Sequence, residues 1–156
     1  MSTVTVAPPT NKDVTDLVHG LLGVDVKEAA ASDDAIYSIA SFKKEDGEIV
    51  GYLACDLGTG CRLGAGLTCI PPNAAEDAVK SGEIPENLSQ NMDEIFNICV
   101  NLLHVADSQR IVLDEVVHGS GAESFATHQQ AIEGGETHTF GFEVARYGLC
   151  KMIVGC

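Results

Sequence analysis

Basic residues are scarce in this sequence, and their scarcity disfavours whole classes of partner. The 156 residues include nine Lys and Arg against 23 Asp and Glu, which gives a formal net charge of −14. Binding to nucleic acid or to an anionic membrane depends on clustered Lys and Arg that neutralise phosphate groups. The composition therefore argues against nucleic acid and membrane surfaces and favours a partner with a basic surface.

Long apolar runs and paired cysteine motifs are also missing. No apolar stretch approaches the roughly 20 residues that a membrane-spanning helix requires. The N-terminal residues MSTVTVAPPT do not resemble a signal sequence. The cysteines form no CxxC pair, so we expect reduced thiols in a cytoplasmic protein. The six cysteines are Cys55, Cys61, Cys69, Cys99, Cys150 and Cys156.

What is present suits one folded domain. Hydrophobic residues make up 45% of the sequence, a share typical of folded rather than disordered chains. A chain of 156 residues is long enough to bury about two thirds of its unfolded surface without disulfides or metals. Residues 1–10 contain two prolines and no periodic pattern, so we expect a flexible N-terminal tail followed by a single domain over residues 11–156.

Helical spacing of apolar residues marks four segments. In the first segment, residues 11–22, Asn11 is placed to cap the N-terminus of the helix and Gly23 is placed to end it. The second is rich in glycine, and we expect a helix of small residues that lies close against the sheet. Pro71 and Pro72 end it, and Asn73 is placed to cap the third. The predicted helices are residues 11–22, 58–70, 73–80 and 85–106.

Alternating and β-branched segments predict the strands. Asp46 and Gly47 form a typical hairpin turn between the first two strands. Residues 24–34 are polar and alanine-rich, and we expect them to be irregular. Residues 118–136 fit either a long excursion or a strand with a ragged loop. The predicted strands are residues 36–42, 48–57, 110–117, 137–144 and 147–154.

The order of these elements favours an α+β fold. The strands cluster before and after a helical middle, whereas an α/β chain would alternate strand and helix. We therefore expect an antiparallel sheet of about five or six strands with the helices packed on one face. Gly58 and Gly60 do not predict a nucleotide-binding loop, because no Lys-Ser or Lys-Thr pair follows them and the order of elements is wrong for one.

Residues 85–106 hold the most distinctive pattern of the sequence. In a helix, which turns by roughly 100° per residue, the apolar residues collect on one stripe that we expect to face the core. The opposite face carries no Lys or Arg and is rich in Asn, a poor helix former. Glu94 and Asn97, spaced i, i+3, would lie side by side on it. The polar face consists of Asn87, Gln90, Asn91, Glu94, Asn97, Asn101 and His104.

This polar face supports two interpretations. An anion beside neutral amides can bind the surface of a partner, and the residues around the Glu94 and Asn97 pair then become partner contacts. The other interpretation is an ordinary surface helix whose composition happens to be rich in Asn. The candidate partner contacts around the pair are Gln90, Asn91, Asn101 and His104.

The order of elements and the spacing on this helix resemble the CheC/CheX/FliY family of chemotaxis phosphatases. The resemblance rests on a hairpin that runs into GYLACDLGTGCRLGAGL, a helical connection, the spacing Glu94-x-x-Asn97 and late antiparallel strands. It spans residues 11–154 in the order of the elements. Members of the family carry a Glu and an Asn at this spacing on an exposed helix, and they remove phosphate from the phosphoaspartate of CheY-like receiver domains.

The resemblance implies a site for the phosphorylated receiver domain of a response regulator. Glu94 would be the anion that docks on a receiver lysine, and Asn97 would be the amide that orients the attacking water. An acyl phosphate is already activated, so positioning supplies most of the catalysis, and a neutral amide does not repel the phosphate. The resemblance further implies that the receiver supplies its own Mg²⁺ and that this chain binds no cofactor or metal.

Two departures from the family pattern bear on activity. The family often has Asp or Ser four residues before the Glu, where this chain has Gln90, and often has a Pro near the following strand, whereas residues 111–120 have none. Two-site members repeat the motif on an earlier helix, where this chain has Asp13 and Asp16. One site per chain most resembles CheX, whose relatives pair, so we expect a homodimer. The alternative is a scaffold or interaction module on the same fold without enzymatic activity.

Histidine and cysteine offer two further kinds of site. His118, His128 and His138 are ten residues apart, but no paired spacing typical of zinc accompanies them. Cys55 and Cys99 are candidate nucleophiles, although both lie in apolar segments where an inert core thiol is the stronger expectation.

Overall fold

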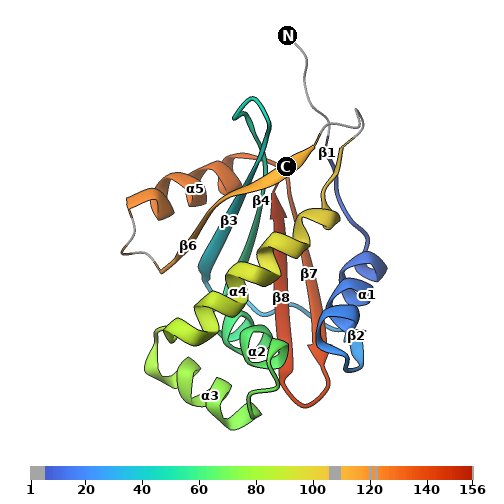
Figure 1. The fold of residues 1–156 in the computed structure, drawn as a ribbon, viewed down its shortest axis with the longest axis vertical. Coiled ribbons are helices and arrows are strands. Elements are labelled where there is room, and N and C mark those ends of the chain that lie inside the picture. Colours follow the sequence, from blue (N-terminus) through green and yellow to red (C-terminus); the bar gives the residue numbers. More distant parts are fainter. Residues whose placement is uncertain (1–5, 106–109, 120, 122, 156) are drawn as a thin grey trace.

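A six-stranded antiparallel sheet forms the centre of the protein in the computed structural model (Figure 1). The strand order is β2-β7-β8-β4-β3-β6, and a separate short pairing joins β1 to β5. The structure describes residues 6–105, 110–119, 121 and 123–155, with only the backbone at positions 6, 7, 104 and 105. The strands are β1 (Val6–Ala7), β2 (Val26–Glu28), β3 (Ile36–Lys44), β4 (Ile49–Asp56), β5 (His104–Val105), β6 (Ile111–His118), β7 (Thr137–Val144) and β8 (Gly148–Gly155).

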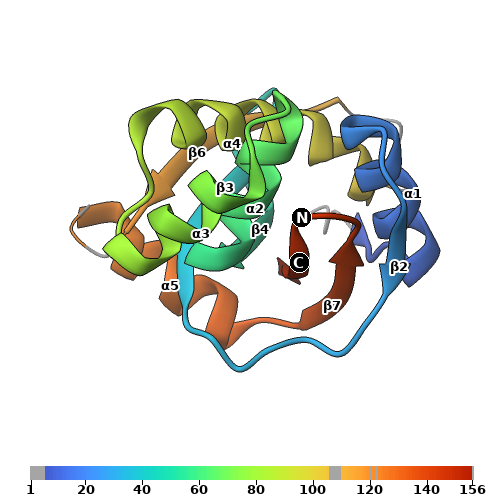
Figure 2. The same cartoon turned by 90° about the horizontal axis from the view of Figure 1, so that it is seen from below.

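Most of the helices cover one face of this sheet. Helices α1, α2 and α4 lie on that face, and α5 lies on the other (Figure 2). None of the helices in the described part of the chain combines the length and the apolarity needed to cross a membrane. The helices are α1 (Asn11–Leu22), α2 (Leu57–Leu67), α3 (Pro72–Ser81), α4 (Glu86–Ile98), the 3-10 turn η1 (Cys99–Leu102) and α5 (Glu123–Gly134).

The alternation of side chains along β3 separates two cores. Phe42 points into the large core with the residues of α1, α2 and α4, whereas Ile39 points the other way, into a small core. Phe125 and Ile132 of α5 complete the small core. The antiparallel sheet with helices confirms the predicted α+β class, and α5 adds a helix on the second face that the sequence did not predict.

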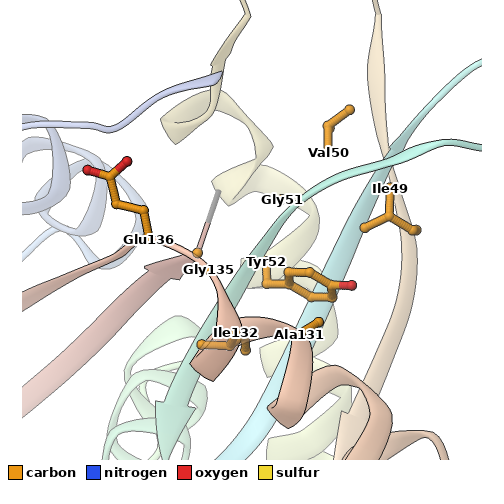
Figure 3. A pocket seen from close by; sticks show the side chains of 9 residues that line it. Ile49, Val50, Gly51, Tyr52, Ala131, Ile132, Gly135 and Glu136 are labelled. Carbon is orange, nitrogen blue, oxygen red and sulfur yellow. The ribbon is translucent and has the colours of Figure 1, made fainter. Parts of the chain in front are cut away.

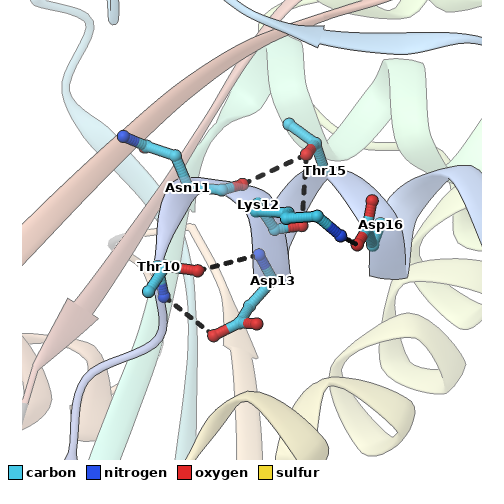
Figure 4. A network of polar contacts seen from close by, with 6 residues as sticks. All are labelled: Thr10, Asn11, Lys12, Asp13, Thr15 and Asp16. Atoms are coloured by element: carbon cyan, nitrogen blue, oxygen red, sulfur yellow. Dashed lines mark hydrogen bonds and ion pairs between the residues drawn. The ribbon is translucent and has the colours of Figure 1, made fainter.

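Two helix starts differ from the prediction. Thr10, not Asn11, caps α1: its hydroxyl oxygen accepts from the Asp13 N–H at 3.1 Å, and the Asp13 carboxylate accepts from the Thr10 N–H at 2.9 Å (Figure 4). Gly23 ends this helix in the left-handed conformation, as predicted. Asn73 does not cap α3, because that helix already begins at Pro72, whose ring suits the first turn.

Three other segments differ from their predicted structure. The helix predicted over residues 85–106 leaves the α conformation after Ile98 and tightens into η1, where residues three apart still share a side, and Ala106 lies outside the described residues. Strand β2 forms within residues 24–34, which were expected to be irregular. Helix α5 forms within residues 118–136, and it escaped prediction because it buries few side chains.

Helix α2 is a helix of small residues, as predicted, and its glycines allow close packing. A Cβ atom at Gly64 would lie 2.8 Å from the backbone oxygen of Leu88 in α4, and one at Gly66 would lie 3.1 Å from the Leu22 side chain in α1. Gly58 and Gly60 belong to the first turn of this helix and are buried, so they do not form an open loop. The absent side chains let α4 and α1 approach α2 closely.

Candidate functional site

Helix α4 is anchored by one face. Leu88, Met92, Ile95 and Phe96 are at most 2% exposed and pack into the large core. Burying a side chain of this size contributes about 1.5–3 kcal/mol relative to leaving it in water. Leu88, Met92 and Ile95 confirm the predicted apolar stripe, and Phe96 is buried beside them although it was not part of that stripe. These contacts fix which residues of α4 face outward.

Glu94 and Asn97 lie on the outward side of this helix. Both side chains are exposed, and neither has a hydrogen-bond or ion-pair partner within the described residues. Their i, i+3 spacing within α4 places them next to each other. The carboxylate and the amide are therefore both available to an external group.

Two of the four surrounding candidates also lie in α4, in different settings. Gln90 is exposed, and its amide donates to Glu86 Oε1 at 3.4 Å. Asn91 is half-buried, and its amide donates to the Gly64 carbonyl oxygen at 2.8 Å and to Thr68 Oγ1 at 3.0 Å. The Asn91 donors are thus used to tie α4 to the end of α2.

The other two candidates lie beyond the end of α4, which corrects their predicted place on the helix. Asn101 lies in η1, where its exposed amide donates to the Ile98 carbonyl oxygen at 3.0 Å. His104 lies in β5, where its backbone pairs with Ala7, and the structure does not describe its side chain. The outward face of α4, called the open face below, consists of Asn87, Gln90, Glu94 and Asn97.

A hydrogen-bonded row of three side chains runs beside the open face. Ser38 Oγ lies 2.7 Å from His118 Nδ1, and His118 Nε2 lies 2.8 Å from Asp93 Oδ1. A neutral imidazole satisfies both contacts when the serine hydroxyl donates to Nδ1 and Nε2–H donates to the carboxylate. Ser38 is fully buried and is not accessible as a nucleophile, so the row joins β3, β6 and α4 structurally.

Sequence reasoning did not find this row. Ser38 and His118 are 80 residues apart in the sequence, and Asp93 and His118 are 25 apart. These side chains come together because β3 pairs with β6 and because α4 packs against β6. No local spacing signals such a contact.

The three evenly spaced histidines lie apart from one another in the structure. His118 belongs to the row just described, His128 Nε2 lies 2.7 Å from Glu115 Oε1, and His138 Nε2 lies 3.5 Å from Glu136 Oε1. Within the described residues, no group of three or more His, Cys, Asp and Glu side chains is arranged to hold a metal ion. Their common spacing of ten residues therefore has no structural counterpart.

Cys55 and Cys99 are core thiols. Both are fully buried in the large core. Burial raises the pKa of the Cys99 thiol to about 12 and the pKa of Cys55 well above its usual value, so both thiols stay protonated at neutral pH. Because the thiolate is the reactive form, this confirms the inert interpretation of the two residues.

Two of the hollows in the described part of the chain lie near α4 and near α5. The α4 hollow, with a volume of about 450 Å³, lies between the turn before α4, the helix itself and the end of β6. A second hollow of about 160 Å³ lies between β4 and the end of α5, where Tyr52 and Ile132 form its walls (Figure 3). The principal side chains of the α4 hollow are Tyr37, Glu83, Ile84, Ser89 and His118.

Several solved structures resemble this chain in fold. Neither a family model nor a curated protein matches the sequence. A chain of the FliM–SpeE complex from H. pylori matches with a TM-score of 0.56 at 8% identity, over 93% of this chain and 80% of that one. A chain of the CheX–CheY–BeF3–Mg²⁺ complex from Borrelia burgdorferi matches with a TM-score of 0.50 at 13% identity, over 93% and 94%.

CheX from Vibrio vulnificus also matches, with a TM-score of 0.48 at 12% identity, over 92% of this chain and 91% of that one. At these identities the likeness concerns the fold. The chain therefore has the CheX-like α+β fold, which confirms, at the level of the fold, the family resemblance expected from the sequence.

Proposed function

We propose that this chain docks on the receiver domain of a two-component response regulator through the open face of α4. The observation that carries the proposal is the exposed pair Glu94 and Asn97, which has no internal partner on a helix whose other face is buried. A matched chain comes from a complex of CheX with CheY, BeF3 and Mg²⁺, which supports a receiver as the partner. A receiver partner would place this chain in the cytoplasm.

The proposed activity is hydrolysis of the receiver's phosphoaspartate. Water attacks the phosphorus, the bond from phosphorus to the aspartate carboxylate oxygen breaks, and the products are the carboxylate and inorganic phosphate. Glu94 pairs with a receiver lysine and sets the register of the two proteins, while the Asn97 amide orients the water by hydrogen bonds. In this proposal the receiver holds the Mg²⁺, and this chain contributes no cofactor.

Gln90 is where the open face departs from the family pattern. Its side chain lies one turn before Glu94 and reaches Glu86 Oε1 at 3.4 Å. A neutral amide at this position gives the partner a hydrogen bond but no charge. In this proposal Glu94 therefore supplies the main electrostatic contact of the open face, and binding depends strongly on it.

The experiment follows phosphate loss from a panel of CheY-like receiver domains charged with acetyl phosphate and Mg²⁺. The unaltered chain should accelerate the loss for at least one receiver. Asn97→Ala should reduce that acceleration by about 100-fold, because a misplaced water costs a factor of this order, and it should leave binding largely intact. Glu94→Lys should weaken binding, measured by titration calorimetry.

Asn73→Ala is the matched control for this experiment. Asn73 is also an exposed helical amide, but it lies on α3, off the open face. Its replacement should change neither binding nor phosphate loss. If Asn97→Ala and Glu94→Lys both behave like this control, the open face is not the receiver site.

A non-enzymatic interaction module is the second candidate. The match to a chain of the FliM–SpeE complex, which is a protein–protein assembly, favours this function on the same fold. Such a module would bind through the open face without turnover. It would form a homodimer through the outer edge of β6, which pairs only with β3 among the described strands. Receiver binding without phosphate loss would favour the module and turnover would exclude it, whereas a dimer mass in sedimentation is expected for either function.

A further inference from the structure

The α4 hollow borders the open face. Ser89 lines the hollow, and Asp93, four residues later on the same flank of α4, holds His118 in its wall. From Asp93, the open-face residues Asn97 and Glu94 follow within an arc of about 100° around the helix. A partner seated on the open face would therefore also cover the mouth of the hollow.

Hydrogen bonds hold the walls of the hollow in place. The Tyr37 hydroxyl accepts from the Ile84 N–H at 3.2 Å, and the Tyr37 carbonyl oxygen accepts from the Gly119 N–H at 2.7 Å. Gly119 has a φ of 82°, and the Tyr37 ring would lie about 3.5 Å from a Cβ atom there. Asp93 fixes the His118 ring at 2.8 Å. Binding to a preformed hollow loses less conformational entropy than binding to one that must first open.

The wall chemistry matches a long basic side chain. Ile84 and the Tyr37 ring offer apolar surface to an aliphatic stem, and the exposed Glu83 carboxylate offers a partner to the charged end. The volume of about 450 Å³ far exceeds the roughly 10–15 Å³ that a cavity needs to hold one water molecule. None of the described residues that line the hollow is Lys or Arg, so an anionic ligand would find neither of these cations there.

The surrounding sequence is strongly acidic. Residues 81–145 contain eleven Asp and Glu but a single basic residue, Arg110, so they carry −10 of the chain's net charge of −14. Four of these carboxylates, on Glu83, Glu86, Asp93 and Glu94, lie on α4 or in the turn before it. Such a field attracts a basic surface.

We infer that the α4 hollow receives a lysine or arginine side chain of the receiver. This inference rests on the proposed function and adds to it a second contact, beside the one made by Glu94. The stem of the basic side chain lies along Ile84 and Tyr37, and its charged end pairs with Glu83. Two separated charge contacts fix the rotation of the receiver on α4, and the chain then discriminates between receivers by whether they carry the second basic residue.

Two substitutions test the contact against a matched control. Glu83→Lys reverses the charge at the hollow, and Ser89→Tyr fills the hollow without changing the charge. Glu45→Lys is the control, because Glu45 is also exposed but lies in the turn between β3 and β4, at the opposite end of the sheet from α3 (Figure 1). Thermal unfolding of each variant, monitored by circular dichroism, verifies that it folds.

The probe is a CheY-like receiver domain that binds the unaltered chain, loaded with BeF3 and Mg²⁺, and the readout is its Kd. Glu83→Lys and Ser89→Tyr should each raise the Kd about tenfold, since each removes a contact and adds a repulsion or a clash. Glu45→Lys should change it less than about twofold, as expected for a remote surface charge. A Lys→Glu or Arg→Glu variant of the receiver that restores binding to Glu83→Lys would identify the occupant.

The failures are distinguishable. If Glu94→Lys weakens binding but Glu83→Lys and Ser89→Tyr behave like Glu45→Lys, the second contact is overturned and the proposed function stands. If Glu83→Lys and Glu45→Lys weaken binding equally, the effect is one of net charge and the hollow has no occupant. If no receiver binds the unaltered chain, the proposed function and this inference fall together.

Discussion

The two faces of α4 differ in how tightly the rest of the chain constrains them. On the inner face, Met92 is fully buried and the Leu88 backbone lies where a side chain at Gly64 would stand. On the open face, Glu94 and Asn97 contact nothing within the described residues that would hold them. The inner face therefore determines stability, and the open face is left for binding. Substitutions on the inner face should therefore lower the free energy of unfolding more than substitutions on the open face.

The largest effect on stability should come from Met92→Ala. This substitution leaves a cavity in the large core and should lower the free energy of unfolding by about 2–5 kcal/mol, measured by urea denaturation. Met92→Leu, which nearly conserves the volume, should cost less than about 1.5 kcal/mol. A loss below about 1 kcal/mol for Met92→Ala would show that the inner face is not packed as described.

The contact between α2 and α4 is the next test. Gly64→Ala places a methyl group 2.8 Å from the Leu88 backbone oxygen and should cost about 1–3 kcal/mol by overpacking. The control is Gly20→Ala in α1, where an added Cβ atom would have no neighbour within 4 Å apart from the local backbone of the helix, and the better helix propensity should add up to about 1 kcal/mol. The two substitutions should therefore shift the urea midpoint in opposite directions, and equal shifts would contradict the close packing.

Asn91→Ala and Asn97→Ala make the same chemical change on the two sides of α4. Loss of the Asn91 hydrogen bonds to Gly64 and Thr68 should cost about 1 kcal/mol of unfolding free energy. Asn97→Ala should change it by less than about 0.5 kcal/mol, because the side chain is exposed and has no partner within the described residues. Equal losses in urea denaturation would remove the distinction between the faces.

The smallest effect on stability should come from Glu94→Gln. The exposed carboxylate has no partner among the described residues, so the unfolding free energy should stay within about 0.5 kcal/mol of the unaltered chain. Receiver binding should weaken, and its dependence on salt should become shallower, because one charge contact is lost. A stability loss comparable with that of Asn91→Ala would mean that Glu94 has a structural role.

Local patterns were sufficient to predict much of the fold. Helix α1 and strand β7 have the predicted bounds, because their apolar periodicity is regular and Gly23 gives a clear stop. Helix α5 was missed because Phe125 and Ile132 are its only buried residues, too few to give a periodic signal. Its place on the second face depends on tertiary contacts with β3 and β6.

The candidate site was only partly predictable for the same reason. The polar stripe of α4 and the Glu94 and Asn97 pair follow from helical geometry alone. The inward role of Asn91 depends on where α2 ends, and the row from Ser38 to Asp93 depends on which strand lies beneath the helix. Contacts between distant segments of this kind leave no trace in local spacing.

Chemical-shift mapping tests the central claim most directly. The isotope-labelled chain would be titrated with a CheY-like receiver loaded with BeF3 and Mg²⁺, and the backbone amide shifts would be followed. We expect shifts centred on Glu94 and Asn97 that extend to Glu83 and Ser89 around the α4 hollow. Shifts centred on the hollow between β4 and α5, with α4 unchanged, would contradict it.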